Sequence, residues 1–119
     1  ACSTIWLMLV SLRQGEFHHT LADTQSVALV LFTSPECGSC RQIKQLLPKL
    51  VETHSDWQIF EVDAQQEMGL TQEFEVFHLP TLFLYHAGAF HCELRAQATL
   101  TDIQVKVAEA LQQPAQEAP

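Results

Sequence analysis

The sequence contains two cysteines separated by two residues, in the segment Cys37-Gly38-Ser39-Cys40. Cysteines at this spacing can close into a disulfide and open again, and can therefore exchange electrons with the disulfides of other molecules. A thiol at the start of a helix meets unpaired backbone N–H groups and the positive end of the helix dipole, and both lower its pKa. Redox chemistry is therefore expected if this segment begins a helix, with Cys37 as the thiolate nucleophile.

The residues on either side predict that the segment lies between a strand and a helix. Residues 27–32 are six apolar residues in a row, which is typical of a buried strand. Between Arg41 and His54, apolar residues recur at spacings of three and four, as on one face of a helix: Ile43, Leu46, Leu47, Leu50 and Val51. Cys40 then lies one turn after Cys37, within reach to resolve a mixed disulfide.

Two other uses of the cysteine pair remain open at this stage. A CxxC segment can supply half of a zinc site, but a closed site takes four ligands, and the sequence has neither a second CxxC nor an HxxxH pair. A purely structural disulfide would close a very small loop and would stabilise the fold little. The strand before the segment and the helix after it favour redox chemistry over both.

The composition is that of an ordinary globular domain. Of the 119 residues, 47% are hydrophobic and 17% are charged, which suffices for one domain with its own core. The formal net charge of −8, without basic runs, argues against binding to nucleic acids or acidic membranes. No apolar stretch approaches the length of a membrane span, and no basic segment precedes the apolar run at residues 5–10. We expect a cytoplasmic protein, with an exported or periplasmic one as the alternative, because cysteines outside the CxxC segment favour a reducing compartment.

Hydrophobic periodicity predicts five strands and four helices in the order β-α-β-α-β-α-β-β-α. The strands are expected at residues 9–12, 27–33, 57–62, 81–85 and 90–94, and the helices within 13–24, at 41–54, at 64–74 and from 99. Strands joined through helices pair in parallel, and the closing hairpin adds an antiparallel edge. The fold class is therefore α/β, a mixed central β-sheet flanked by helices on both faces.

Single residues refine this outline. Met68 and Leu70 are expected to face inward from the helix at 64–74. Gly88 can supply a positive φ in the hairpin turn. Thr99 and Asp102 can form a capping box at the start of the last helix.

The chain is expected to have three parts. These are an apolar N-terminal arm at residues 1–8, a domain at residues 9–112 and a flexible C-terminal tail at residues 113–119. The arm, which holds Cys2, can extend the first strand, cover a core edge or mediate a dimer. Cys92, on a predicted strand, is expected to be a small core residue rather than a reactive thiol.

The CxxC segment at a strand-to-helix junction, followed by Leu79-Pro80-Thr81 before a later strand, resembles the thioredoxin family. The resemblance extends from about residue 9 to residue 111 and implies the thioredoxin fold. It also implies a cis peptide bond at Pro80, which packs beside the CxxC segment, and a backbone at Leu79 that pairs with an extended substrate.

The same resemblance implies a mechanism. Cys37 attacks a substrate disulfide as a thiolate, and the more buried Cys40 then attacks the mixed disulfide and releases the reduced substrate. Gly38 and Ser39 join Leu79 and Pro80 as the expected substrate-binding residues.

The sequence departs from the family pattern in two regions. Well-known members have Trp before the first cysteine and Pro before the second, where this chain has Glu36 and Ser39. Many also have a buried Asp six residues before the first cysteine, where Leu31 stands here, and a lysine partner in the region of Ile59 and Phe60. A slower reductant or a different redox potential is expected.

Three side chains near the segment are candidates for tuning the pKa of Cys37. Glu36 adjoins Cys37 and would raise its pKa as a like charge, whereas Arg41 would oppose that effect if it reached back. Both are alternatively solvated surface residues. His78 is expected near the nucleophile, or alternatively as an exposed loop histidine.

Together these features predict a thioredoxin-like thiol–disulfide oxidoreductase that acts on protein disulfides in cell redox homeostasis. No cofactor is expected, because no nucleotide, flavin or haem motif occurs. Electrons would come from an upstream reductase or a small thiol. The alternatives are a binding or folding-helper module of the same fold and a metal carrier that uses the CxxC segment.

Overall fold

The computed structural model describes residues 9–119, and five strands in this part of the chain form one mixed sheet in the order β1-β3-β2-β4-β5. β1 (Leu9–Ser11) and β2 (Val27–Thr33) both pair in parallel with β3 (Gln58–Asp63). β4 (Thr81–His86) runs antiparallel to β2. β5 (Ala89–Leu94) runs antiparallel to β4 and forms an edge of the sheet.

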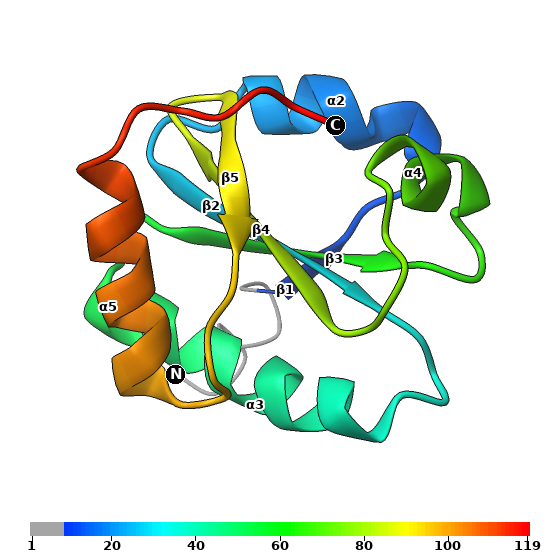
Figure 1. Cartoon of the computed structure of the whole chain (residues 1–119), viewed down its shortest axis with the longest axis horizontal. Helices are drawn as coiled ribbons and strands as arrows, with labels where there is room; N and C mark the ends of the chain where they lie inside the picture. The colour runs from blue at the N-terminus through cyan, green and yellow to red at the C-terminus, as the bar shows by residue number, and fades with distance from the viewer. Residues whose placement is uncertain (1–8) are drawn as a thin grey trace.

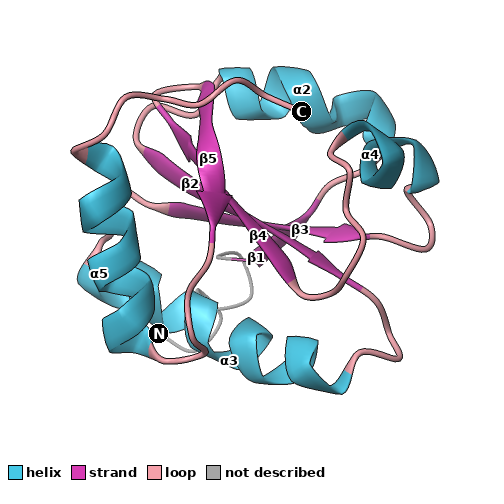
Figure 2. Ribbon diagram, viewed as in Figure 1, coloured by secondary structure: helices cyan, strands magenta, loops and turns pink. Residues whose placement is uncertain are grey.

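Helices cover both faces of this sheet (Figure 1). α2 (Gln14–Ala22) and α4 (Met68–Glu73) lie over one face. α3 (Gly38–Thr53) and α5 (Leu100–Leu111) lie over the other (Figure 2). The fold class predicted from the order of elements is therefore confirmed.

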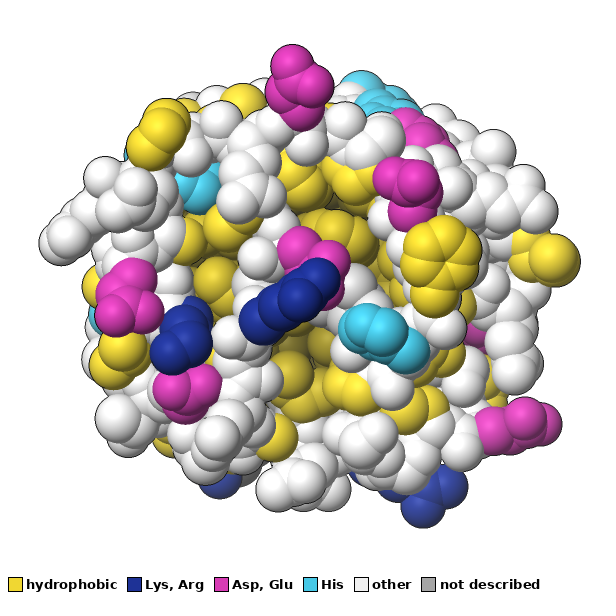
Figure 3. Space-filling view, in the orientation of Figure 1, with side chains coloured by type: hydrophobic (Ala, Val, Ile, Leu, Met, Phe, Trp, Pro, Cys, Tyr) yellow, Lys and Arg dark blue, Asp and Glu magenta, His cyan; other side chains and the backbone are white. Residues whose placement is uncertain are grey.

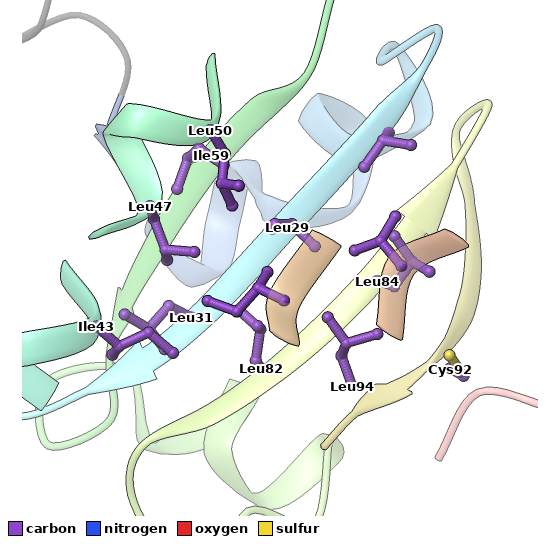
Figure 4. Close-up of a cluster of buried hydrophobic side chains, with 13 residues drawn as sticks. Leu29, Leu31, Ile43, Leu47, Leu50, Ile59, Leu82, Leu84, Cys92 and Leu94 are labelled. Atoms are coloured by element: carbon purple, nitrogen blue, oxygen red, sulfur yellow. The ribbon is translucent and has the colours of Figure 1, made fainter. Parts of the chain in front are cut away.

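β2 is buried along its whole length because it lies in the middle of the sheet. Its successive side chains point to opposite faces, so Leu29 and Leu31 join the cluster under α3 and α5, while Val30 and Phe32 join the cluster under α2 and α4. Figure 4 shows the first cluster, in which three labelled side chains of α3 point toward the strands: Ile43, Leu47 and Leu50. This packing docks α3 on the sheet and thereby fixes the position of its N-terminus.

The helix predicted at residues 64–74 is shorter than expected, because α4 begins only at Met68. The Asp63 carboxylate accepts hydrogen bonds from the backbone N–H groups of Gln65 (2.9 Å) and Gln66 (3.2 Å). These bonds stabilise a turn after β3 that competes with helix formation. Leu70 is buried as predicted, but Met68 is 61% exposed. The prediction for Met68 is wrong because it assumed a helix that already begins at residue 64.

Only half of the predicted capping box forms at the start of α5. The Thr99 hydroxyl accepts a hydrogen bond from the Asp102 N–H (3.1 Å). The Asp102 carboxylate accepts from the Gln97 N–H (2.6 Å) instead of from Thr99. The Thr99 N–H already donates to the Gln97 carbonyl (2.8 Å), and therefore does not need the carboxylate.

The chain after α5 crosses β5 near the start of that strand (Figure 1). The Gln116 N–H donates to the His91 carbonyl (2.7 Å), and His91 Nε2 lies 2.6 Å from a backbone carbonyl oxygen near the end of α5. His91 therefore connects β5 to both segments. The flexibility of residues 113–119 stays a prediction, and the arm predicted at residues 1–8, with Cys2, lies outside the described residues.

The turn between β4 and β5 contains two residues with positive φ, and substitutions there test the cost of that backbone conformation. Ala87 has a φ of 53° and Gly88 a φ of 84°, and a Cβ at Gly88 would lie 2.5 Å from the Ala22 carbonyl oxygen. We expect Gly88→Ala to lower the free energy of unfolding by about 2 kcal/mol, through strain and this contact. Ala87→Gly should raise it by about 0.5 kcal/mol, because glycine adopts positive φ freely. Urea denaturation measures both changes, and an unchanged midpoint for Gly88→Ala would contradict the first.

Candidate functional site

Cys37 lies at the junction between β2 and α3, where the sequence predicts it. β2 ends at Thr33 and α3 begins at Gly38, with Cys37 as the N-cap residue. Cys37 and Cys40 form a disulfide, and their Cα atoms are 5.3 Å apart. The packing of α3 on the sheet therefore holds both sulfurs beyond the carboxyl end of the central strand.

The two cysteines differ in exposure and in their contacts. Cys40 is 1% exposed, whereas Cys37 is only half-buried. The Cys40 N–H donates to the Cys37 sulfur (3.2 Å), and the Ser39 hydroxyl oxygen lies 3.6 Å from that sulfur. A backbone donor and the positive end of the helix dipole stabilise negative charge at an N-cap. The same surroundings favour a thiolate at Cys37 once the disulfide is reduced.

The loop before β4 lies across a hollow from α3. The Leu79–Pro80 peptide bond is cis, as the family resemblance implies. The hydroxyl of buried Thr81 donates to the His78 carbonyl (2.6 Å) and lies 3.4 Å from His78 Nδ1. Pro80 and Ile43, a residue of α3, line the same hollow of about 450 Å³. The loop before β4 and Ile43 of α3 therefore border one hollow.

Of the predicted site residues, His78 and Pro80 line this hollow. The substrate-binding candidates are all at least partly accessible: Gly38, Ser39, Leu79 and Pro80. Glu36, Arg41 and His78 are exposed. Within residues 9–119, the Cys37 sulfur forms its hydrogen bonds with Cys40 and Ser39 rather than with any of these three. A role for the three in tuning the pKa of Cys37 stays a prediction.

The sheet behind the site holds a charged group that sequence reasoning missed. Leu31 and Ile59, which stand near the positions of the family's Asp and Lys, are both fully buried. Glu61, the register partner of Leu31 on β3, accepts a hydrogen bond from the Thr33 hydroxyl (2.9 Å) and lies 2.6 Å from Lys44 Nζ on α3. Ile59 and Glu61 are two residues apart on a strand and therefore share one face of the sheet. A charged residue on the same face as a buried one was the signal that could have predicted a buried partner for Glu61. This ion pair links α3 to β3 without adding net charge near the sulfurs.

Cys92 is a core residue, as predicted. It is buried on β5 and belongs to the hydrophobic cluster under α3 and α5. Burial, followed by the nearby charge of Glu93, raises the pKa of its thiol. The neutral thiol is therefore favoured, and Cys92 is a poor nucleophile compared with a capped, accessible cysteine.

Two further properties concern the alternatives raised by the sequence. Within residues 9–119, no group of three or more His, Cys, Asp or Glu side chains is arranged to hold a metal ion. In the same range, none of the helices combines the length and the apolar character that crossing a bilayer requires.

Comparison with known proteins gives relatives for this chain. The family model for thioredoxin matches residues 8–109. Thioredoxin-2 of Saccharomyces cerevisiae is 30% identical over 74 residues, which cover 62% of this chain and 71% of the yeast protein. Thioredoxin domain-containing protein 2 of Mus musculus is 38% identical over 71 residues, or 59% of this chain. The matched region spans only 14% of that mouse protein and 13% of its rat counterpart.

Solved structures have the same fold. The oxidised form of mitochondrial thioredoxin 3 from Saccharomyces cerevisiae has a TM-score of 0.75 at 20% identity, and the match covers 88% of this chain and 98% of that one. Thioredoxin f2 from Chlamydomonas reinhardtii has a TM-score of 0.72 at 22% identity, with 91% and 99% covered. These likenesses establish the fold, and the family model spans most of the chain. The chain therefore belongs to the thioredoxin family.

Proposed function

We propose that this protein is a thiol–disulfide oxidoreductase that exchanges disulfides with protein substrates through Cys37 and Cys40. One observation carries the proposal: an accessible sulfur at a helix N-terminus is bonded to a buried sulfur one turn away. The accessible sulfur can meet a substrate, whereas the buried one reaches only its partner.

The proposed reaction, written in the reducing direction, has two exchange steps. The Cys37 thiolate attacks one sulfur of a substrate disulfide, and the other substrate sulfur leaves as a thiolate. The Cys40 thiolate then attacks the Cys37 sulfur, expels the second substrate thiolate and closes the Cys37–Cys40 disulfide. Two electrons pass to the substrate, and each expelled thiolate takes up a proton. A reductase or a small thiol must return the two electrons.

Four residues are proposed to hold the substrate beside Cys37. Gly38 and Ser39 expose the first turn of α3, and Pro80 lines the hollow between that helix and the loop before β4. Leu79 is proposed to offer its backbone to an extended segment. We also propose a cytoplasmic location, a proposal supported by the free thiol of Cys92.

A binding or folding-helper module of the same fold is the second candidate. Buried Leu31 favours it, because the family pattern has an acid at this position that helps to move the proton of the resolving thiol. Without that acid, release of the Cys40 proton is expected to be slower, and the cysteine pair would be kinetically secondary.

A reductase assay separates the two candidates. With insulin as the substrate and a dithiol as the electron source, the wild-type protein should accelerate disulfide reduction. The double variant Cys37→Ser/Cys40→Ser should show only the background rate. Equilibration with mixtures of reduced and oxidised glutathione then measures the redox potential. Equal, negligible turnover in both proteins would favour the binding module.

A further inference from the structure

β5 is an edge strand that needs protection from other strands. Within residues 9–119, β5 has six residues and pairs only with β4, whereas β1, at the other edge, has three residues. An edge strand presents unpaired backbone N–H and C=O groups, to which a further strand can add. Lysine and proline commonly protect such an edge, but β5 contains neither. Protection of β5 must therefore come from its backbone shape or from another segment of the chain.

His91 lies at a bulge in β5. Leu84 on β4 pairs with Cys92, and the next residue, Tyr85, pairs with Phe90. His91 stands between these two pairs and has no register partner on β4. The bulge interrupts the ladder and leaves the backbone of His91 available to a segment other than β4.

The C-terminal strap, which we define as residues 112–119, binds at this bulge. The Gln116 N–H donates to the His91 carbonyl (2.7 Å). His91 Nε2 donates to the Ala110 carbonyl (2.6 Å), just before the strap begins, because a carbonyl oxygen can only accept. His91 is itself buried. One buried residue of β5 therefore holds both the base and the middle of the strap.

The strap lies across the edge of the sheet. It crosses β5 near the start of that strand (Figure 1), and its residues Gln116 and Pro119 line a hollow of about 340 Å³ together with Phe74 and Phe83. Figure 3 shows this face in the same orientation, with hydrophobic side chains at the bottom of hollows. A strand added to β5 would lie about 4.8 Å from it. Because the strap backbone is already within hydrogen-bond distance of His91, it excludes another strand there.

The composition of the strap prevents it from extending the sheet itself. Pro114 and Pro119 stand on either side of Gln116, and neither has a backbone N–H to donate. The strap can therefore close the edge at one point without offering a regular row of donors to a further strand.

We propose that the strap blocks pairing between two copies of this chain, and that its release lets β5 of one copy pair antiparallel with β5 of another. The partner is a second copy because two identical edges are complementary to each other in antiparallel pairing, and the contact closes as a two-fold dimer. The dimer does not involve the cysteine pair, so its absence would leave the proposed function untouched.

The test uses Gln116→Pro, which removes the N–H that holds the strap and keeps the chain at full length. Loss of one hydrogen bond of ordinary strength should raise the fraction of open straps about fivefold. Because both copies must be open, the association constant of the dimer should rise about 25-fold. Sedimentation velocity over a range of protein concentrations measures this constant. Ala118→Pro is the matched control, because the Ala118 N–H forms no hydrogen bond within residues 9–119, and it should behave as the wild type.

Amide hydrogen exchange locates the contact. In Gln116→Pro, backbone amides of β5 should gain protection as the dimer forms. In the wild-type protein, the Gln116 amide should exchange more slowly than the Ala118 amide, a measurement that stands even if a variant fails to fold.

Four results would overturn the inference. These are equal exchange of the two wild-type amides, a Gln116→Pro protein that is folded by circular dichroism and associates no more than the wild type, equal association of Ala118→Pro, and a dimer with unprotected β5 amides. A covalent dimer on non-reducing electrophoresis would also contradict it, because the contact would then be a disulfide.

Discussion

Replacing Cys40 with serine is expected to stop the reaction at the mixed disulfide, whereas replacing Cys37 with serine prevents that disulfide from forming. Both changes should lower insulin reduction at least about 100-fold, because two residues that act as a unit do not compensate for one another. Only Cys40→Ser should accumulate a covalent complex with the substrate.

The asymmetry follows from burial. The sulfur of Cys37 is accessible at the N-cap of α3, so it can attack a substrate even when Cys40 is absent. Cys40 as a whole residue is 1% exposed, so its sulfur is not expected to reach a protein disulfide when Cys37 is absent. Serine does not attack a disulfide under these conditions, so the Cys40→Ser complex has no internal route to release its substrate.

Non-reducing electrophoresis and mass spectrometry of the protein after exposure to oxidised substrate measure this trap. Cys92→Ser serves as the control, because Cys92 is buried in the core and should leave turnover unaffected. A stable complex on Cys37→Ser, or equal complexes on both single variants, would reverse the assignment of nucleophile and resolving cysteine.

The second large effect is expected for Leu31→Asp, which places an acid in the core. Leu31 is fully buried against the cluster that docks α3. Loss of the leucine packing and burial of a carboxyl group should together lower the free energy of unfolding by about 4 kcal/mol at pH 7. The loss of packing should also affect function, because this cluster fixes the start of α3, where Cys37 lies.

The destabilisation by Leu31→Asp should depend on pH in one direction. Burial raises the pKa of the new carboxyl group in the folded state above the value of about 3.9 in the unfolded chain. As the pH rises above 4, the unfolded state loses this proton first and is favoured, so the loss of stability grows toward pH 7. Well below pH 4 the group is protonated in both states, and only the packing loss and the burial of a neutral carboxyl group remain.

Urea denaturation of the oxidised protein at pH 4.5 and pH 7.5 measures this dependence against the wild type. Leu31→Asn, which cannot ionise, should lose about 3 kcal/mol at both pH values and separates packing from titration. A loss for Leu31→Asp that is equal at the two pH values would show that the new carboxylate is solvated, or that it pairs with Lys44 on the adjoining helix.

Several features of the site were predictable because they depend on neighbours in the sequence. The apolar run at residues 27–32 predicts the buried strand β2. The spacing of Ile43, Leu47 and Leu50 by three and four residues predicts the helix α3 and its buried face. Because Cys37 stands between this strand and this helix in the sequence, it lies at the N-cap of the helix. The cis bond at Pro80 followed from the family pattern rather than from the residues alone.

Other features required the folded chain. Met68 was misplaced because the Asp63 side chain forms a turn that delays α4, and a hydropathy pattern does not represent such bonds. The pairing of Glu61 with Lys44 depends on how β3 lies under α3. Those residues are 17 positions apart in sequence, a separation at which periodicity carries no information about contact.

The sequence by itself determined where the two thiols lie, because residue type and spacing place them one turn apart at the start of a helix. The family resemblance implied that Cys40 is the more buried thiol, but only the tertiary structure decided what covers it and what surrounds Cys37. Cys40 is buried in the folded chain, while the loop before β4 brings Pro80, His78 and the exposed Phe77 to the edges of two hollows. Exposure depends on what packs over a residue, and these covering segments are distant in the chain.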